Sequence, residues 1–303
     1  MENNLYKYWP IIRRPRLELP NGARVAFWIG LNVEHFLLDK PSTSITPVTA
    51  HLVPDPLNYG WRDYGPRVGI WRVMDLLDRL GMRASVLLNA DVCHYYPEII
   101  EEGNRRGWIW LAHGKNNSTL QANMSPEEER RYLTDVVSTI KQSSGKQPRG
   151  WLGPALSETF ETPNILAELG VEYICDWCND DQPYPMQVRQ GRMISLPYSI
   201  EVNDIPVALD RGLPAEQFAQ MIKDQFDQLY AEGERGGRIM AVALHPFIIG
   251  QAFRAKYLEQ ALSYVAGHDK VWVTTSDEIA DWYYANYYEQ ALTEIETARA
   301  KYQ

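Results

Sequence analysis

The chain has 303 residues, a formal net charge of -9 and an isoelectric point near 5.3. This length suits one α/β barrel, which needs roughly 250 residues, and the acidic balance argues against broad binding to a phosphate backbone. The sequence has no signal pattern at its N-terminus and no apolar run that approaches the roughly eighteen residues of a membrane span, so we expect a cytoplasmic protein.

Short β-type runs alternate with longer helical ones, as in a parallel sheet with crossover helices. Ser125, Pro126 and Glu128 combine an N-cap, a first-turn proline and a capping-box glutamate, which predicts a helix to about Gln142. Gly81 is expected to end the helix 68–80 in a left-handed conformation. Further helices are predicted to open at 96 and 162. The predicted strands are 24–31, 84–88, 108–111, 149–152, 171–175, 193–196, 239–244 and 271–273.

These elements make roughly seven or eight βα units without an internal repeat, so we predict one α/β domain over 1–303 with an N-terminal arm at 1–22. A C-terminal helix over about 277–303 is predicted to dock through one face. That face carries Tyr287, Ala291, Ile295 and Ala298. The many aromatic residues lead us to expect a homo-oligomer, a dimer or tetramer. Three cysteines are an odd number in so long a chain and indicate core residues of a reducing compartment.

Polar residues recur where the predicted strands end. Asn32 and Glu34 follow the first strand, His113 follows the third, and His245 follows a late one. Because active sites of α/β barrels gather at the carboxyl ends of the strands, we expect these residues to share one pocket. The alternative is that polar residues simply mark the beginnings of loops.

Five short motifs stand in a fixed order along the chain. They are Asn32-Val33-Glu34-His35, His113-Gly114-Lys115-Asn116-Asn117, Arg149-Gly150-Trp151-Leu152-Gly153-Pro154, Asn179-Asp180-Asp181-Gln182-Pro183-Tyr184 and Leu244-His245-Pro246. In this order the chain resembles the polysaccharide deacetylase superfamily over nearly its whole length. It is most similar to the branch with metal-independent allantoinases, cyclic imide hydrolases and peptidoglycan-deacetylase-like proteins. The resemblance implies a distorted (β/α) barrel of seven to eight strands.

The resemblance also implies a metal site, from which this chain departs. Typical deacetylases have an aspartate base and an aspartate ligand in the first motif, where this chain has Asn32 and Glu34; a one-residue shift would give Glu34 and His35. The two histidine ligands of the second motif correspond to His113 and Asn117. Since an amide oxygen is a poor zinc ligand, we expect no cofactor. The alternative is a weakly held divalent metal such as zinc on Glu34, His113 and Asn117.

Without a metal, hydrolysis needs a base for water and an acid for the leaving nitrogen. Glu34 is the candidate base, and His245 is the candidate acid because an imidazole titrates near neutral pH. The resemblance gives Arg149 the role of orienting a catalytic carboxylate. The competing interpretations are a structural histidine and an ordinary surface arginine.

Four further residues are candidates for substrate binding. Asp180 and Asp181 follow a strand in a turn-like run, so one of them either recognises a substrate nitrogen or orients Arg149, or the pair simply forms the turn. Tyr64 and Trp151 are candidate walls of the pocket, with ordinary core packing as the alternative.

We therefore predict a hydrolase that opens a non-peptide C–N bond in a small cyclic amide, imide or ureide with base-activated water. The alternative is a metal-dependent N-deacetylase of an amino sugar or glycan, and a third class is a non-catalytic descendant that binds a metabolite. The expected partner is a small-molecule substrate, with no nucleic acid and no membrane.

Overall fold

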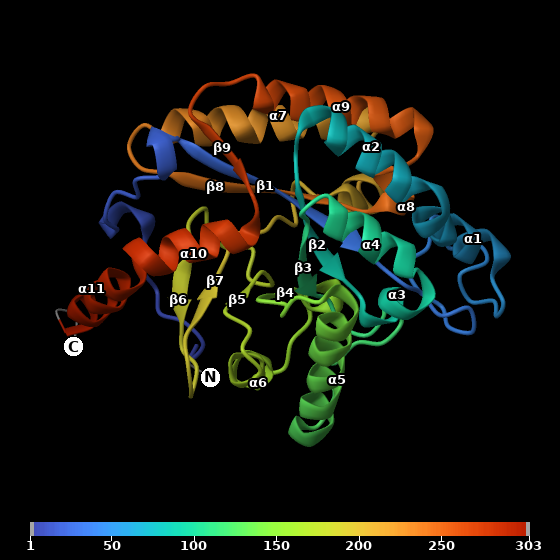
Figure 1. Ribbon diagram of the computed structural model, residues 1–303, viewed down its shortest axis with the longest axis horizontal. Coiled ribbons are helices and arrows are strands. Elements are labelled where there is room, and N and C mark those ends of the chain that lie inside the picture. The colour runs from blue at the N-terminus through green and yellow to red at the C-terminus, as the bar shows by residue number, and fades with distance from the viewer. Residues whose placement is uncertain (1–2, 301–303) are drawn as a thin grey trace.

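The computed structural model describes residues 3–300, and the side chains up to residue 297 (Figure 1). A nine-stranded sheet forms its centre, in the order β6-β7-β5-β4-β3-β2-β1-β8, and β9 pairs with the first half of β1. All neighbours are parallel except β6 and β7. The strands are β1 (Val25–Val33), β2 (Ala84–Leu88), β3 (Ile109–Ala112), β4 (Gly150–Trp151), β5 (Tyr173–Ile174), β6 (Tyr184–Met186), β7 (Met193–Ser195), β8 (Arg238–Leu244) and β9 (Val271–Thr274).

Most helices cover the outside of the sheet, with α7 and α9 side by side over β8 and β9, whereas α10 and α11 pack on its inner side (Figure 1). The helices are α1 (Pro56–Tyr64), α2 (Ile70–Leu80), α3 (Ala90–Tyr95), α4 (Pro97–Arg105), α5 (Pro126–Ser144), α6 (Thr162–Glu168), α7 (Ala215–Glu232), α8 (Pro246–Ile249), α9 (Ala252–Ala266), α10 (Ser276–Asn286) and α11 (Tyr288–Ala300). The capping box predicted for α5 is confirmed, because Ser125 and Glu128 cap each other's backbone. Gly81 ends α2 with a φ of 63°, as predicted.

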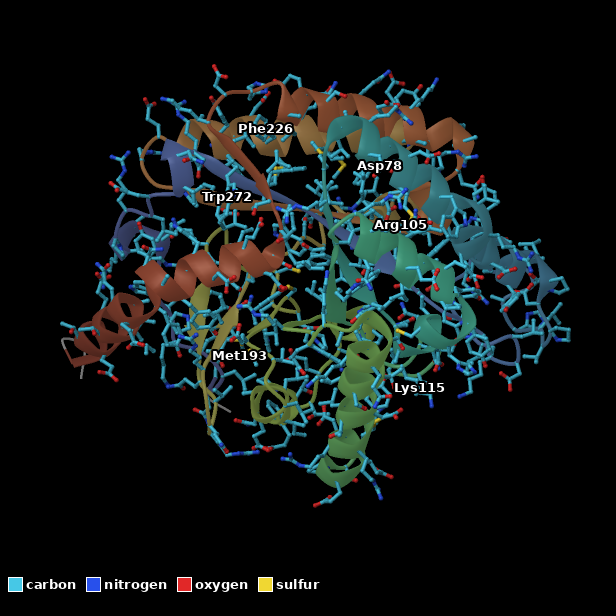
Figure 2. The ribbon with its side chains drawn as sticks, viewed as in Figure 1. Asp78, Arg105, Lys115, Met193, Phe226 and Trp272 are labelled. Atoms are coloured by element: carbon cyan, nitrogen blue, oxygen red, sulfur yellow. The ribbon has the colours of Figure 1, made fainter. Side chains whose placement is uncertain are left out.

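Side chains alternate between the two faces of each strand, which gives the protein two apolar clusters. The outer cluster lies under the helices and includes Phe27 of β1 and Phe226 of α7. The inner cluster fills the concave side of the sheet, and Trp28 of β1 belongs to it. Figure 2 shows Phe226 among the helices above the sheet and Trp272 on β9, where it borders the inner cluster. A residue's odd or even position in its strand therefore decides which side it faces.

The sheet curls into a half-barrel, and the predicted α/β fold class is confirmed (Figure 1). In the part of the chain that the structure describes, β6 and β8 do not pair with each other. Connecting segments cover the free edge of β8 instead: the Ile239 N–H donates to the Asp181 carbonyl at 2.9 Å, and the Ala243 N–H donates to the Val202 carbonyl at 3.0 Å. This second segment places the residues after Val202 beside the end of β8.

The structure also adds elements that the sequence pattern did not predict. The β6–β7 hairpin is antiparallel, and α1 begins at Pro56, where the Asp55 carboxylate caps it. The single predicted C-terminal helix is two helices, because the backbone leaves helical geometry at Tyr287, with a φ of -132°. The predicted docking face is confirmed at Tyr287, just before α11, and at Ala291 and Ile295 of α11, which all pack on the inner cluster. The side chain of Ala298 and residues 301–303 lie outside the described part.

The three cysteines are free, and two of them are buried, which agrees with their predicted role as core residues. None of the described helices combines the length and the apolar character that crossing a bilayer requires.

Candidate active site

Glu34 stands just beyond the carboxyl end of β1, and its side chain is only 3% exposed. The Oε1 atom faces three nitrogen groups: Nε2 of His113 at 3.4 Å, Nε2 of His245 at 3.6 Å, and the side-chain amide of Asn117. The Oε2 atom is buried without a hydrogen-bond partner. A buried carboxylate oxygen without a partner is costly unless a ligand or water pairs with it, so Oε2 marks the place where a reacting molecule is expected.

His245 is held from behind by Asp204, a residue that the sequence analysis did not single out. The Nδ1–H of His245 donates to Asp204 Oδ1 at 2.6 Å, and its backbone N–H donates to Oδ2 at 2.8 Å. Burial lowers the pKa of His245, but the carboxylates of Asp204 and Glu34 raise it more, so the net shift is upward from 6.5. The two carboxylates therefore stabilise the imidazolium form, in which Nε2–H is directed at Glu34.

His113 approaches Glu34 from β3. Its Nδ1 lies 2.6 Å from the carbonyl oxygen of Leu152, which only accepts hydrogen bonds, so this nitrogen carries a proton. In the neutral ring, Nε2 then presents a lone pair to the space beside Glu34. A water molecule there would find two acceptors, the carboxylate and this imidazole nitrogen.

The orientation of Asn117 follows from its neighbours. The His35 N–H donates to Asn89 Oδ1 at 2.9 Å, so the Asn89 amide nitrogen must face Asn117. That nitrogen donates to Asn117 Oδ1 at 3.0 Å, which turns the Asn117 nitrogen towards Glu34. Asn117 therefore gives the site a hydrogen-bond donor.

The predicted metal set of Glu34, His113 and Asn117 does not fit a cation. A metal ligand must offer a lone pair, and Asn117 turns an N–H group towards Glu34 while its oxygen is occupied by Asn89. Among the described residues, no group of three histidine, cysteine, aspartate or glutamate side chains is arranged to hold a metal ion. The assignment of Asn117 as a ligand is therefore wrong for this arrangement.

The first motif has its predicted register. Asn32 faces the inner side of the sheet, where its amide donates to the Tyr198 hydroxyl at 2.8 Å and the Leu244 carbonyl at 3.1 Å. The one-residue shift is wrong, because His35 turns away and stacks on Tyr95, with ring centroids 4.3 Å apart. Asn32 thus links β1 to β8 beside the site and has no ionisable group to act as a base.

A narrow cleft of about 10 Å³, room for about one water molecule, lies beside Glu34. Its other walls come from the segment after β1, from α1 and from the turn before α4. The lining residues are Glu34, Phe36, Tyr59, Arg62, Asp63, Pro66 and Tyr96. The turn after α1 packs closely on the residues after β8 and closes the site. The two segments approach so closely at Gly69 that a Cβ atom there would overlap the carbonyl of Pro246.

Arg149 does not contribute to this site, and the prediction that it orients a catalytic carboxylate is wrong. It precedes β4, so it lies at the amino end of the sheet, opposite to Glu34. There its Nε donates to Glu172 at 2.7 Å, and its other nitrogens reach Asp281. Trp151 is also misassigned as a pocket wall, because it faces the outer side of β4 and is fully buried under the helices.

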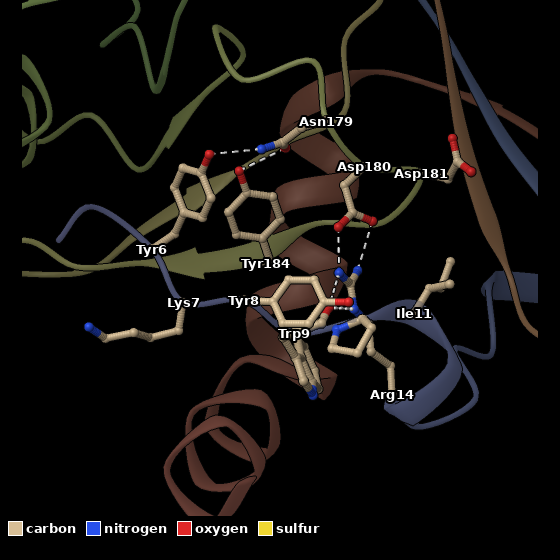
Figure 3. Close-up of a pocket in the computed structure, with 11 residues that line it drawn as sticks. Tyr6, Lys7, Tyr8, Trp9, Ile11, Arg14, Asn179, Asp180, Asp181 and Tyr184 are labelled. Carbon is tan, nitrogen blue, oxygen red and sulfur yellow. Dashed lines mark hydrogen bonds and ion pairs between the residues drawn. The ribbon is translucent and has the colours of Figure 1, made fainter. Parts of the chain in front are cut away.

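Asp180 and Asp181 also lie away from Glu34. Figure 3 shows the Asp180 carboxylate paired with the guanidinium of Arg14, in a pocket of about 350 Å³ formed by the N-terminal arm. Asp181 lies beside the amino end of β8, where its carbonyl accepts from Ile239. These two residues hold the arm and cover the sheet edge, so the prediction that they bind substrate in the Glu34 site is wrong.

Tyr64, the fourth candidate for substrate binding, is not among the residues that line the cleft. Its hydroxyl accepts from Arg72 at 2.7 Å, which directs it towards α2. The neighbouring residues Tyr59 and Arg62 line the cleft instead. The helical periodicity of α1 would have identified them, because positions 59 and 62 lie on the same face of a helix.

Comparison with known proteins agrees with this geometry. Residues 61–174 match the family described as Polysaccharide deacetylase. A probable polysaccharide deacetylase from Pseudomonas aeruginosa PAO1 has the same fold, with a TM-score of 0.83 at 26% identity over 90% of this chain and 95% of that one. The residues matched by the family model run from α1 to β5. The resemblance predicted from the motifs is thereby confirmed, and so is the assignment to the C–N hydrolases of this family.

Other similar proteins differ in their named substrates. A Helicobacter pylori protein named Peptidoglycan deacetylase is 25% identical over 75% of this chain and 87% of its own length. The crystal structure of PuuE allantoinase shares the fold, with a TM-score of 0.82 at 23% identity over 90% of this chain and 95% of that chain. Proteins with both kinds of name are thus similar to this chain, and its substrate is a matter of proposal.

Proposed function

We propose that this protein hydrolyses a non-peptide C–N bond in a small cyclic amide, imide or ureide, with Glu34 as the base and His245 as the acid. One observation carries the proposal: the carboxylate of Glu34 and the imidazole of His245, both buried, face each other across 3.6 Å. A pair of titratable groups with opposite tasks in one enclosed site is what amide hydrolysis requires.

The proton path follows from the contacts of the two groups. Water bound between Glu34 and His113 loses a proton to Glu34 as its oxygen attacks the carbonyl carbon. The Nε2–H of His245 then protonates the leaving nitrogen as the C–N bond breaks. The proton on Glu34 finally returns to His245 across the short gap between them, which resets both groups.

Two features support the metal-free opening of a small ring. The cleft beside Glu34 has a free volume of only about 10 Å³, far below that of a typical site for a drug-sized ligand, so its walls leave little room for a bulky substrate. The amide of Asn117 holds Glu34 by hydrogen bonding, so the reaction we propose uses no metal. The similarity to the protein named Peptidoglycan deacetylase favours the second candidate, removal of an acetyl group from an amino sugar.

The test is a panel of cyclic imides, ureides and N-acetylated sugars, assayed with and without chelator. We expect ring opening that resists the chelator, and a loss of at least about 100-fold in kcat for Glu34→Gln and His245→Gln. His268→Gln is the matched control, since His268 lies after α9 and bonds only to the backbone of that helix. Acetate release restored by zinc would instead support the deacetylase, and unchanged rates in both variants would contradict either mechanism.

The proposal also covers the substrate size, the location and the partners of the protein. We propose a small-molecule substrate, a cytoplasmic location, and neither nucleic acid nor membrane as partner. The homo-oligomer also stays a prediction, which size measurement in solution would test.

A further inference from the structure

Arg62 is a buried arginine without an ion pair. Its residue is only 3% exposed, although it lines the cleft beside Glu34. One nitrogen donates to the carbonyl of Thr43 at 2.5 Å, while Nε is buried without an acceptor. No ion pair of Arg62 with a carboxylate is found in the described part of the chain. Two other arginines with buried side chains have one: Arg14 is paired with Asp180, and Arg238 with Glu232.

Aromatic rings hold the Arg62 guanidinium in place. Its carbon lies 5.0 Å from the ring centre of Phe36, which comes two residues after Glu34. Phe36 packs edge-on against Phe247, two residues after His245, with centroids 5.8 Å apart. Trp61, the neighbour of Arg62, meets the same Phe247 ring at 4.9 Å. The guanidinium is therefore fixed to the two segments that carry the proposed base and acid.

The acidic groups of the cleft are already occupied. Asp63 is paired with Arg67, and Oε1 of Glu34 accepts from the amide of Asn117 and faces Nε2 of His245. A guanidinium offers five N–H groups in a fixed plane, and leaving some of them buried without acceptors is costly. A ligand that brings an anionic oxygen would remove that cost and complete the site.

We propose that Arg62 binds a carboxylate on the substrate, so that the preferred substrates of the Glu34 site are cyclic amides, imides or ureides that carry a negative charge. This inference rests on the proposed function, because it names the substrate class of the same site. Arg62 acts only in binding, while Glu34 and His245 carry out the cleavage of the C–N bond.

Binding without turnover tests the charge preference directly. Succinate and succinamide have similar size and differ in charge, and their binding is measured by calorimetry at low ionic strength. We expect succinate to bind at least about tenfold more tightly than succinamide, because succinamide cannot form a charge-assisted hydrogen bond with the guanidinium. Arg62→Gln should abolish this difference. Arg79→Gln is the matched control, because Arg79 is an exposed arginine on α2 that pairs with Glu259.

Kinetics then separate binding from chemistry. With carboxymethyl hydantoin, we expect Arg62→Gln to raise KM at least about tenfold and to change kcat less than about twofold. With the neutral carbamoylmethyl analogue, neither constant should change. Arg62→Lys keeps the charge but loses the planar fork, so its increase in KM should be smaller than that of Arg62→Gln. It replaces the glutamine variant in the test if that variant does not fold.

The outcomes distinguish this inference from the proposed function. If both hydantoins are opened and Arg62→Gln affects them equally, or lowers kcat, the carboxylate-binding role is wrong and the hydrolase remains. If neither hydantoin is opened but succinate still binds through Arg62, the proposed reaction fails and the anion site stands. Equal binding of succinate and succinamide to the wild type overturns the inference.

Discussion

Asp204 is the most informative position to change, because it touches the proposed acid and not the reacting atoms. It is 2% exposed and pairs with His245 at 2.6 Å. Asp204→Asn keeps the shape but has no charge and only one acceptor oxygen for the two N–H groups that Asp204 now binds.

The expected magnitude follows from this burial. Breaking a buried ion pair by removing one partner costs about 3 to 5 kcal/mol. If that energy is lost where the imidazolium must be held in the transition state, kcat/KM falls by roughly two to four orders of magnitude. An exposed pair of the same kind would contribute less than about 1 kcal/mol.

The pH dependence has a defined sign. Burial lowers the pKa of His245, and the carboxylates of Asp204 and Glu34 raise it above 6.5. An acid with a raised pKa keeps its proton to higher pH, so activity is lost on the alkaline side only above that pH. In Asp204→Asn the largest raising contribution is gone, and the alkaline limb of the profile moves to lower pH.

The assay is the initial rate of ring opening across the neutral pH range, with near-ultraviolet circular dichroism to confirm folding. Asp180→Asn is the matched control, since it removes a carboxylate from an ion pair with Arg14 far from the cleft and should leave the profile unchanged. A rate for Asp204→Asn within about threefold of the wild type, or an unmoved alkaline limb, would refute the role assigned to this pair.

Three further changes test other parts of the structure. Asn117→His replaces the donor at Glu34 by an imidazole, and we expect more zinc per chain by elemental analysis; unchanged zinc would contradict the stated reason for the poor fit. Arg149→Gln should leave kcat unchanged and cost about 0.5 to 1.5 kcal/mol in urea unfolding, because its ion pairs are partly exposed; a loss of activity would restore its catalytic role. Burial raises the pKa of Asp176 from 3.8 to about 7. The wild type should therefore lose stability relative to Asp176→Asn as pH rises through that interval, by on the order of 2 to 4 kcal/mol, and a constant difference would contradict this.

Local patterns predicted most of the strands and the helix ends, since they depend on neighbours in the sequence. The boundaries of β2 agree with the predicted 84–88, and the cap of α5 is the predicted one. The β6–β7 hairpin was missed because Tyr184–Met186 is too short to show an alternating pattern and contains a proline. The length of the segment joining these strands gave no sign of their antiparallel pairing.

For the site residues, the alternation of side chains between the two faces of a strand predicts their location better than their position at a strand end does. Asn32, Glu34, His113 and His245 all continue the inner face of their strands, and all four meet at the carboxyl edge. Trp151 continues the outer face, so its burial under the helices followed from the same rule.

Arg149 was misplaced for a different reason: it precedes its strand, and in a parallel sheet the residues before a strand lie at the opposite edge. Asp204 could not be found in this way, because it follows no strand. Its position depends on the bridge between Asn203 and Ala243, which is a tertiary contact.

The change at position 117 shows how a distant backbone group can determine the chemistry of a site. The N–H of His35 can only donate, so Asn89 must turn its oxygen towards it and its nitrogen towards Asn117. Asn117 then has only its own nitrogen to offer to Glu34. An imidazole at this position could present a lone pair, and a cation would then compete with protons for Glu34. With the amide in place, Glu34 and His113 keep their lone pairs for water, which is the arrangement that the proposed metal-free hydrolysis needs.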